Sequence, residues 1–217
     1  MISIYALKPR FQSLLRPLVR WLANKGITAN QVTLAAAVGS LLVALGVAWG
    51  APLLWPYALI PLWMLLRMAL NAIDGMLARE FGQQSRLGAY LNELCDVIAD
   101  SALYLPFALL PGVSPLLVMI IVLLAAVVEY AGVLGLMVGA SRRYDGPMGK
   151  SDRAAVFGLL GMLVAWGGLP PYWLNLLLGL VLLLLIYTLY NRVRHRRGAA
   201  YLSTASRCLF NGAYRSI

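Results

Sequence analysis

The sequence predicts an all-α integral membrane protein with six transmembrane helices and an amphipathic interfacial helix at its N-terminus. Of its 217 residues, 61% are hydrophobic and only 12% are charged, a composition too apolar for a soluble globular domain. Its apolar runs approach the roughly 20 residues that cross a bilayer. Basic residues gather at alternate turns between these runs, as they do at cytoplasmic turns of membrane proteins. We therefore expect one helical membrane domain and no separate soluble domain.

The N-terminal segment, 1–26, is expected to lie on the cytoplasmic leaflet as an amphipathic helix. Its leucines recur at helical spacing, its arginines occupy other faces, and Pro9 and Pro17 would bend it. An ordinary cytosolic helix is the alternative interpretation. The segment has no continuous apolar core followed by a small-residue cleavage site, so we expect no removable signal peptide.

Six spans are expected within a membrane domain that covers 27–191. Thr28 and Gln31 have the form of a capping box at the start of the first span, and Pro56 suits the first turn of the second. Tryptophan and tyrosine residues cluster near the outer boundaries, as in the aromatic belts of membrane proteins. An even number of spans places both termini in the cytoplasm. The expected spans are 27–49, 56–79, 88–109, 115–139, 153–166 and 172–190.

The net charge of +10, from 18 basic and 8 acidic residues, is compatible with either nucleic acid or membrane lipid as a partner. Because the basic residues cluster at the inner turns and in the tail 192–217, anionic lipid headgroups explain the charge better than nucleic acid does. We therefore expect a multi-pass protein of the cell (inner) membrane with a basic cytoplasmic tail. The two cysteines, Cys95 and Cys208, do not imply a disulfide framework.

The stretch from Asn71 to Asp100 concentrates five acidic residues and two asparagines in apolar surroundings. Ionisable groups at membrane depth are rare and usually face a functional site or a partner. At about 100° per residue, Asn71 and Asp74 share one side of a helix, and Asn92 and Asp96 share one side of the next. If the two helices are antiparallel neighbours, their oxygen atoms converge at one end of the membrane, and such a cluster needs cations.

These residues resemble the signature of the CDP-alcohol phosphotransferases, which is D-x-x-D-G-x-x-A-R, eight residues, and then G-x-x-x-D-x-x-x-D. Every spacing of the signature is present in this sequence. The two departures both replace aspartate with asparagine, at Asn71 and Asn92. The matching positions are Asn71, Asp74, Gly75, Ala78 and Arg79, followed by Gly88, Asn92 and Asp96.

The resemblance implies a transferase that cleaves the diphosphate of a CDP-linked lipid or small alcohol, joins the phosphoryl group to an acceptor hydroxyl and releases CMP. It also implies one or two Mg²⁺ or Mn²⁺ ions, with Asp96 as the general base. Independently, attack on a diphosphate requires charge neutralisation, an aligned nucleophile and a proton acceptor. The positions implied to hold metal are Asn71, Asp74, Asn92 and Asp96. The positions implied to meet the CDP donor are Asp74, Gly75, Ala78, Arg79 and Gly88.

The two asparagines leave three interpretations of the metal site open. An asparagine offers a neutral carbonyl oxygen to a metal ion but contributes no charge. Asn71 and Asn92 still act as weak ligands, or Glu93 or Asp100 replaces the missing charge, or only one ion binds and catalysis is slow or absent. We favour a changed ligand set that includes Glu93 and Asp100, because an uncompensated carboxylate in a membrane is otherwise hard to explain.

Five further residues are candidates for binding a phosphate or the acceptor. Each has an alternative role: an ion pair with an acidic neighbour for Arg67, a polar helix contact for Glu129, and membrane topology for the basic residues of the 142–153 loop. A phosphorylated acceptor is compatible with these positions. The five candidates are Arg67, Glu129, Arg142, Lys150 and Arg153.

We therefore expect a cavity that opens to the cytoplasm and a transferase of phospholipid biosynthesis. CDP-diacylglycerol is the expected donor, because a fully embedded chain admits lipid laterally, and the acceptor is an alcohol that the sequence does not identify. The resemblance also implies a homodimer. One alternative is a catalytically weakened relative that binds CDP-lipid or metal without turnover. The other is a small cation-coupled transporter, a poorer fit because no inverted halves are visible.

Overall fold

The computed structural model describes residues 4–51, 53–137 and 146–213, and it is helical throughout these ranges with no strand. This confirms the all-α fold class. The elements in chain order are α1 (Ile4–Asn24), α2 (Ala29–Gly50), the 3₁₀ turn η1 (Trp55–Ala58), α3 (Leu59–Glu80), α4 (Arg86–Tyr104), the 3₁₀ turn η2 (Leu105–Leu109), α5 (Pro115–Met137), α6 (Lys150–Ala165) and α7 (Pro171–Ala213).

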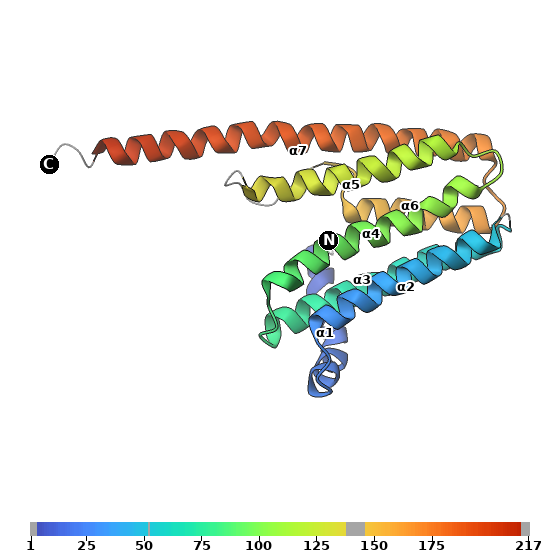
Figure 1. Cartoon of the computed structure of the whole chain (residues 1–217), viewed down its shortest axis with the longest axis horizontal. Helices are drawn as coiled ribbons and strands as arrows, with labels where there is room; N and C mark the ends of the chain where they lie inside the picture. Colours follow the sequence, from blue (N-terminus) through green and yellow to red (C-terminus); the bar gives the residue numbers. More distant parts are fainter. Residues whose placement is uncertain (1–3, 52, 138–145, 214–217) are drawn as a thin grey trace.

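Four helical segments in the described ranges are long and apolar enough to cross a membrane: Ala29–Gly50, Trp55–Glu80, Pro115–Gly135 and Pro171–Arg194. The helix α4 has 19 residues but carries three acidic groups, and α6 has only 16 residues. Both helices run alongside the apolar ones in the bundle (Figure 1). These four segments make the chain a multi-pass membrane protein. The expected number of six transmembrane helices stays a prediction.

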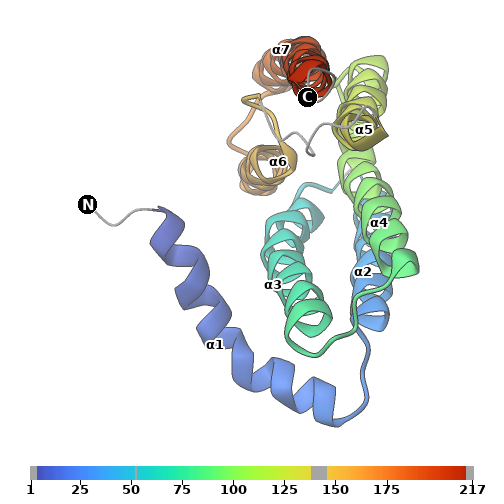
Figure 2. The same ribbon diagram turned by 90° about the vertical axis from the view of Figure 1, so that its left-hand side faces the viewer.

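The bundle consists of two groups of three helices. Figure 2 shows α2, α3 and α4 together on one side and α5, α6 and α7 on the other. The groups meet where α3 contacts α6 and where α4 contacts α5. An aromatic cluster fills this junction: the Tyr104 and Phe157 rings stack 3.9 Å apart, and Phe107 lies edge-on to Phe157 and Tyr57 at 5.4 Å. The Tyr57 hydroxyl donates a hydrogen bond to the Pro106 carbonyl at 2.6 Å, so the one polar atom of that ring is satisfied.

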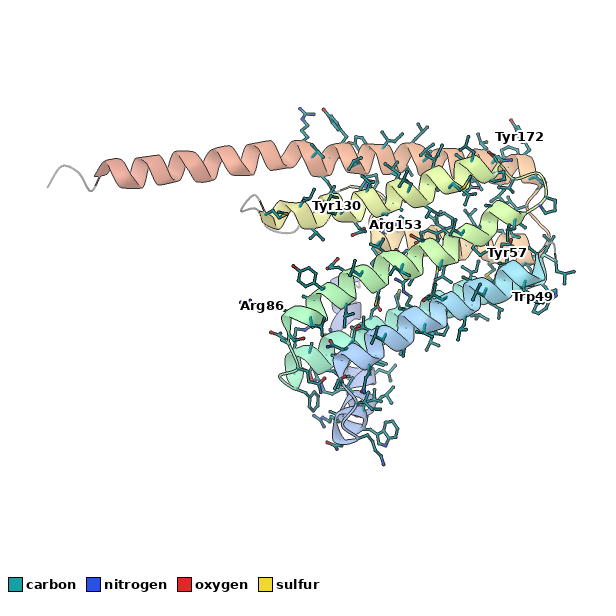
Figure 3. All side chains as sticks on the ribbon, viewed as in Figure 1. Trp49, Tyr57, Arg86, Tyr130, Arg153 and Tyr172 are labelled. Atoms are coloured by element: carbon teal, nitrogen blue, oxygen red, sulfur yellow. The ribbon has the colours of Figure 1, made fainter. Side chains whose placement is uncertain are left out.

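The two ends of the bundle differ in chemistry. Trp49 and Tyr172 lie at one end, whereas Arg86 lies at the other (Figure 3). The Trp49 and Trp166 side chains are 94% and 81% exposed on the surface of the chain, as expected of residues that meet a membrane interface. The opposite end carries the connection between α3 and α4 and the start of α6, and it is where the polar residues of the sequence gather.

The helix α1 contacts α3 and projects away from the bundle (Figure 2). Val19 is fully buried in a small cluster with residues of α2 and α3, and Arg16 pairs with Glu80 of α3 at 2.9 Å. Leu14 and Trp21 remain exposed. The helix itself is present, and its place on a membrane surface stays a prediction.

The tail differs from the expected solvated segment in two respects. The helix α7 continues without interruption to Ala213, beyond the apolar part that ends at Arg194. Arg192, expected at the start of the tail, is only 1% exposed because it pairs with Glu129 and donates a hydrogen bond to the Val128 carbonyl at 2.6 Å. A sequence pattern of basic residues cannot show that one of them turns inward toward a buried acid.

Close packing of α6 on η1 and α3 depends on Gly161. A Cβ atom at this position would lie 2.9 Å from the Tyr57 carbonyl oxygen and 3.3 Å from Ile60 Cβ. Small residues at such positions allow two membrane helices to approach closely.

We expect Gly161→Ala to destabilise the fold by about 1–3 kcal/mol, because overpacking forces the helices apart. The measurement is the unfolding midpoint of the purified protein in detergent. Gly46→Ala in α2 is the matched control, since its Cβ meets no atom within 4 Å and alanine favours the helix. An equal midpoint for Gly161→Ala and the control would contradict this account of the packing.

Candidate functional site

A cavity of about 1330 Å³ lies between α2, α3, α4 and α5, and every signature residue except Asp96 lines it. It also reaches the connection between α3 and α4, near Arg86 (Figure 3). The predicted site residues in its wall are Asn71, Asp74, Gly75, Ala78, Arg79, Gly88, Asn92, Glu93 and Glu129. The helices α3 and α4, predicted to be antiparallel neighbours, each pack mainly on α2, and Arg67 and Asn71 of α3 reach Asp96 of α4 through their side chains.

Local hydrogen bonds hold the mouth of this cavity. Ser85 caps α4, and its hydroxyl accepts a hydrogen bond from the Gly88 amide at 2.9 Å. The Gln83 side-chain oxygen accepts one from the Ala29 amide at 2.7 Å. An amide at the start of α2 is thus satisfied by the α3–α4 connection, which anchors this connection to a neighbouring helix.

The two glycines of the signature permit close approach. A Cβ atom on Gly88 would lie 2.7 Å from the Asn30 side-chain oxygen, and one on Gly75 would lie 3.0 Å from a guanidinium nitrogen of Arg79. Glycine at 88 therefore lets Asn30 of α2 lie directly against α4. Glycine at 75 leaves room for the Arg79 side chain to fold back along its own helix.

The two signature aspartates have different partners. Asp74 is 6% exposed, and its Oδ2 accepts a hydrogen bond from the Thr33 hydroxyl at 2.8 Å. Asp96 Oδ1 accepts hydrogen bonds from Arg67 Nη2 at 3.1 Å and from Asn71 Nδ2 at 3.4 Å. Asp96 Oδ2 contacts the Lys150 ammonium. Asp96 is therefore placed between two cations, whereas Asp74 is held by a neutral hydroxyl.

A chain of buried ion pairs continues from Asp96 into the bundle. Arg67 pairs with Asp100, and Arg153 Nη2 lies 3.2 Å from the other oxygen of that carboxylate. Arg153 Nη1 also lies 3.0 Å from Glu129 Oε1, and Arg192 completes the chain at 3.6 Å from the same atom. Arg153 lies inside the bundle, among α4, α5 and α6 (Figure 3). Buried charges persist when each has such a partner.

The structure divides the remaining candidates by their surroundings. Arg67 and Arg153 are 4% and 1% exposed and pair with acids inside the bundle. Lys150 is the first residue of α6, and its side chain is 32% exposed beside Asp96. Arg142 lies outside the described residues.

The cavity wall contains oxygen donors that could hold a metal ion. Among the residues that the structure describes, no three Asp, Glu, His or Cys side chains gather as a potential metal site. The cavity wall nevertheless offers the Asp74 carboxylate and the amide groups of Asn71 and Asn92. Oxygen donors of this kind suit a hard cation such as Mg²⁺ or Mn²⁺.

Several residues of the site were missed from the sequence. Asn30, Gln83, Gln84 and Ser85 line the cavity, and Thr33 holds Asp74. Asn30 and Thr33 are three residues apart and so share one face of α2, a signal that the sequence contains. The glutamines had no such signal, because a role in capping another helix depends on the tertiary fold.

Comparison with known proteins agrees with this geometry. The family model for CDP-alcohol phosphatidyltransferase matches residues 26–189. The chain is 48% identical over 194 residues to the inner membrane protein YnbA of Escherichia coli K12, covering 89% of this chain and 96% of that protein. It is 31% identical over 109 residues to the phosphatidylinositol phosphate synthase of Streptomyces avermitilis, covering 50% of this chain and 43% of that enzyme.

Solved structures share the fold. The phosphatidylinositol phosphate synthase of Mycobacterium tuberculosis with CDP-DAG bound superposes with a TM-score of 0.70 at 22% identity, over 83% of this chain and 92% of the other. The same enzyme in complex with manganese and citrate gives a TM-score of 0.67 at 22% identity, over 83% and 87% of the two chains. With the family model covering most of the chain and seven of the eight signature residues lining one cavity, the chain belongs to the CDP-alcohol phosphatidyltransferase family.

Proposed function

We propose that the protein transfers a phosphatidyl group from a CDP-linked donor to an alcohol hydroxyl and releases CMP. The donor that we propose is CDP-diacylglycerol. The observation that carries this proposal is the convergence of seven of the eight signature residues of α3 and α4 on one cavity, with Asp96 in contact with Asn71 of the cavity wall. Family membership supports the reaction class. The donor is supported by the fold shared with a synthase that binds CDP-DAG.

In the proposed reaction, the acceptor oxygen attacks the phosphorus that carries the diacylglycerol. The bond from that phosphorus to the bridging oxygen breaks, and CMP leaves with the bonding electrons. Asp96 accepts the hydroxyl proton. A carboxylate has four lone-pair positions, so the contacts with Arg67 and Lys150 do not use all the positions at which Asp96 can accept a proton. The carboxylate and its two cations thus hold the acceptor hydroxyl and the donor phosphate close together.

The donor would occupy the wall formed by α3 and α4. Gly75, Ala78 and Gly88 leave space for the nucleotide, and Arg79 meets a phosphate or the cytidine end. Asp74, with Asn71 and Asn92, would hold a Mg²⁺ or Mn²⁺ ion, which neutralises phosphate charge when bound. Glu93 also lines the cavity and is the nearest additional candidate for this ligand set.

The contacts of Asp100 favour a positioning role over metal binding. Both of its oxygens face guanidinium groups, from Arg67 and Arg153. Arg67 in turn orients Asp96, so the buried pairs hold the proton acceptor in place. Glu129 remains a candidate for acceptor binding, because it both lines the cavity and belongs to the buried chain. Arg142 stays a candidate for binding an acceptor phosphate.

We also propose a six-span arrangement in the inner membrane with both termini and the cavity mouth on the cytoplasmic side. The separation of the aromatic end from the basic end supports it. The printed name of the Escherichia coli relative places that protein in the inner membrane. In this arrangement α1 lies on anionic headgroups with Leu14 and Trp21 toward the lipid. A homodimer belongs to the same proposal and rests on the family resemblance alone.

The alternative is a relative that binds the donor without turnover. Its supporting observation is that two signature carboxylates are asparagines and a third, Asp96, is occupied by cations. The test below separates this alternative from an active enzyme.

Asp96→Asn is expected to lower CMP release from CDP-diacylglycerol by about 10²–10⁴-fold, because the proton acceptor is lost. The measurement is CMP release by purified protein with Mg²⁺ or Mn²⁺ across a panel of alcohols. Glu80→Gln is the matched control, since Glu80 pairs with Arg16 on the exterior. Wild-type rates in Asp96→Asn would contradict the assignment, and donor binding without CMP release from the wild type would favour the alternative.

Asp100→Asn is expected to destabilise the fold by about 3–5 kcal/mol, because it leaves two buried guanidinium groups short of a counter-charge. The unfolding midpoint in detergent measures this loss, with Glu80→Gln again as the exposed control. A variant of unchanged stability that has lost Mn²⁺ binding would instead identify Asp100 as a metal ligand.

Single cysteines placed in a variant lacking Cys95 and Cys208 test the topology. We expect Pro111→Cys and Gly168→Cys to react with an impermeant maleimide on intact cells, because both positions lie at the aromatic end. Gln84→Cys at the cavity mouth is expected to react only after permeabilisation. Labelling of Gln84→Cys and Pro111→Cys from the same side would contradict six spans.

A further inference from the structure

Resting on the proposed function, we propose that the Lys150 ammonium, together with the Arg67 guanidinium, takes the electrostatic place of a second divalent ion. The site then holds at most one such ion. The positions of the two asparagines and the partners of Asp96 lead to this inference.

The first step is the charge at the four signature positions. Asn71 and Asn92 are neutral, so of the four signature positions implied to hold metal only Asp74 and Asp96 carry formal negative charge. Two divalent ions held by two carboxylates would leave a large positive excess in a low-dielectric site.

The second step is the occupancy of Asp96. Its Oδ1 accepts hydrogen bonds from Arg67 and Asn71, and its Oδ2 contacts the Lys150 ammonium. If Asp96 held a metal ion, its oxygens would be needed for that ion. Here they contact a guanidinium and an ammonium, which are the cations that protein side chains supply for phosphate recognition.

The third step is the balance of the whole cluster. The four acids Asp74, Asp96, Asp100 and Glu129 are matched by the four bases Arg67, Lys150, Arg153 and Arg192. In the cavity wall, Glu93 adds one negative charge, and Arg79 and Arg86 add two positive charges. The cluster therefore carries no excess negative charge without metal. A single divalent ion matches a donor diphosphate that carries one negative charge on each phosphate, and a second ion would add two positive charges that no acid balances.

The position of Lys150 fits this role better than that of the other bases. Lys150 is the first residue of α6, and its ammonium contacts Asp96 of α4. Its side chain is 32% exposed. Arg153 and Arg192 are each 1% exposed and are held by Glu129. Lys150 is therefore the base that can contact both Asp96 and a phosphate arriving from the cytoplasmic end.

The test counts Mn²⁺ ions per chain by the loss of the free Mn²⁺ signal in electron paramagnetic resonance, with CDP present and no acceptor. We expect no more than one ion for the wild type and for Asn71→Asp/Asn92→Asp. Adding Lys150→Met to that pair of substitutions is expected to give two ions. The matched control adds Lys25→Met instead, a lysine in the exposed turn after α1, and is expected to give one.

A second measurement uses single substitutions in the wild-type background and so does not depend on the folding of the triple variant. Lys150→Met is expected to lower CMP release about 100-fold, because it removes one positive charge that stabilises the transition state. Lys150→Arg keeps the positive charge and is expected to retain part of the activity. Lys150→Met is also expected to weaken CDP binding in the absence of any acceptor. Unchanged CDP binding would overturn the inference and assign Lys150 to the acceptor.

The outcomes separate this inference from the proposed function. Two Mn²⁺ ions in the wild type, with CMP release intact, would overturn the inference and leave the transferase proposal standing. Failure of the folded triple variant to bind a second ion would also overturn it. One ion, bound with CDP but without CMP release for any alcohol, would support the inference and overturn the proposed reaction.

Discussion

The rest of the structure depends on the pairing of charges that are buried between apolar helices. An isolated charge in such surroundings is costly, whereas a paired and hydrogen-bonded one is tolerated. The chain from Asp96 through Arg67, Asp100, Arg153 and Glu129 to Arg192 meets this requirement. It joins α3, α4, α5, α6 and α7, so the same ion pairs that satisfy the acids also set how the two groups of helices fit together.

This network explains how buried acids and bases coexist with an apolar bundle. Away from the cavity, the groups pack through the aromatic rings of Tyr104, Phe107 and Phe157. At the cavity, the α3 and α4 walls carry small and polar residues, and Gly88 lets Asn30 lie against α4. The structure is thus apolar and aromatic at one end and polar at the other, and the cavity reaches the polar end.

The same network bears on how the site would work with fewer carboxylates than the family signature. Asp96 is oriented by Arg67 and Lys150, and Asp74 by Thr33. Fixed positive charges from protein side chains need no free metal in solution, and they are oriented before the substrate arrives. In the arrangement we propose, replacement of aspartate by asparagine at two positions changes how the site is neutralised and does not by itself remove the means of neutralisation.

Composition and local spacing along each helix were sufficient to predict the membrane class, the helical periodicity and the signature face from Asn71 to Asp96. The sequence also placed Lys150 and Glu129 among the candidates. The pairing of acids with bases follows only from the tertiary fold: Asp100 lies between Arg67 and Arg153, Arg192 turns inward to Glu129, and Lys150 reaches Asp96. The physical reason is that ion pairs between helices depend on packing distances and rotation about each helix axis, and no local pattern in one segment contains the position of its partner in another.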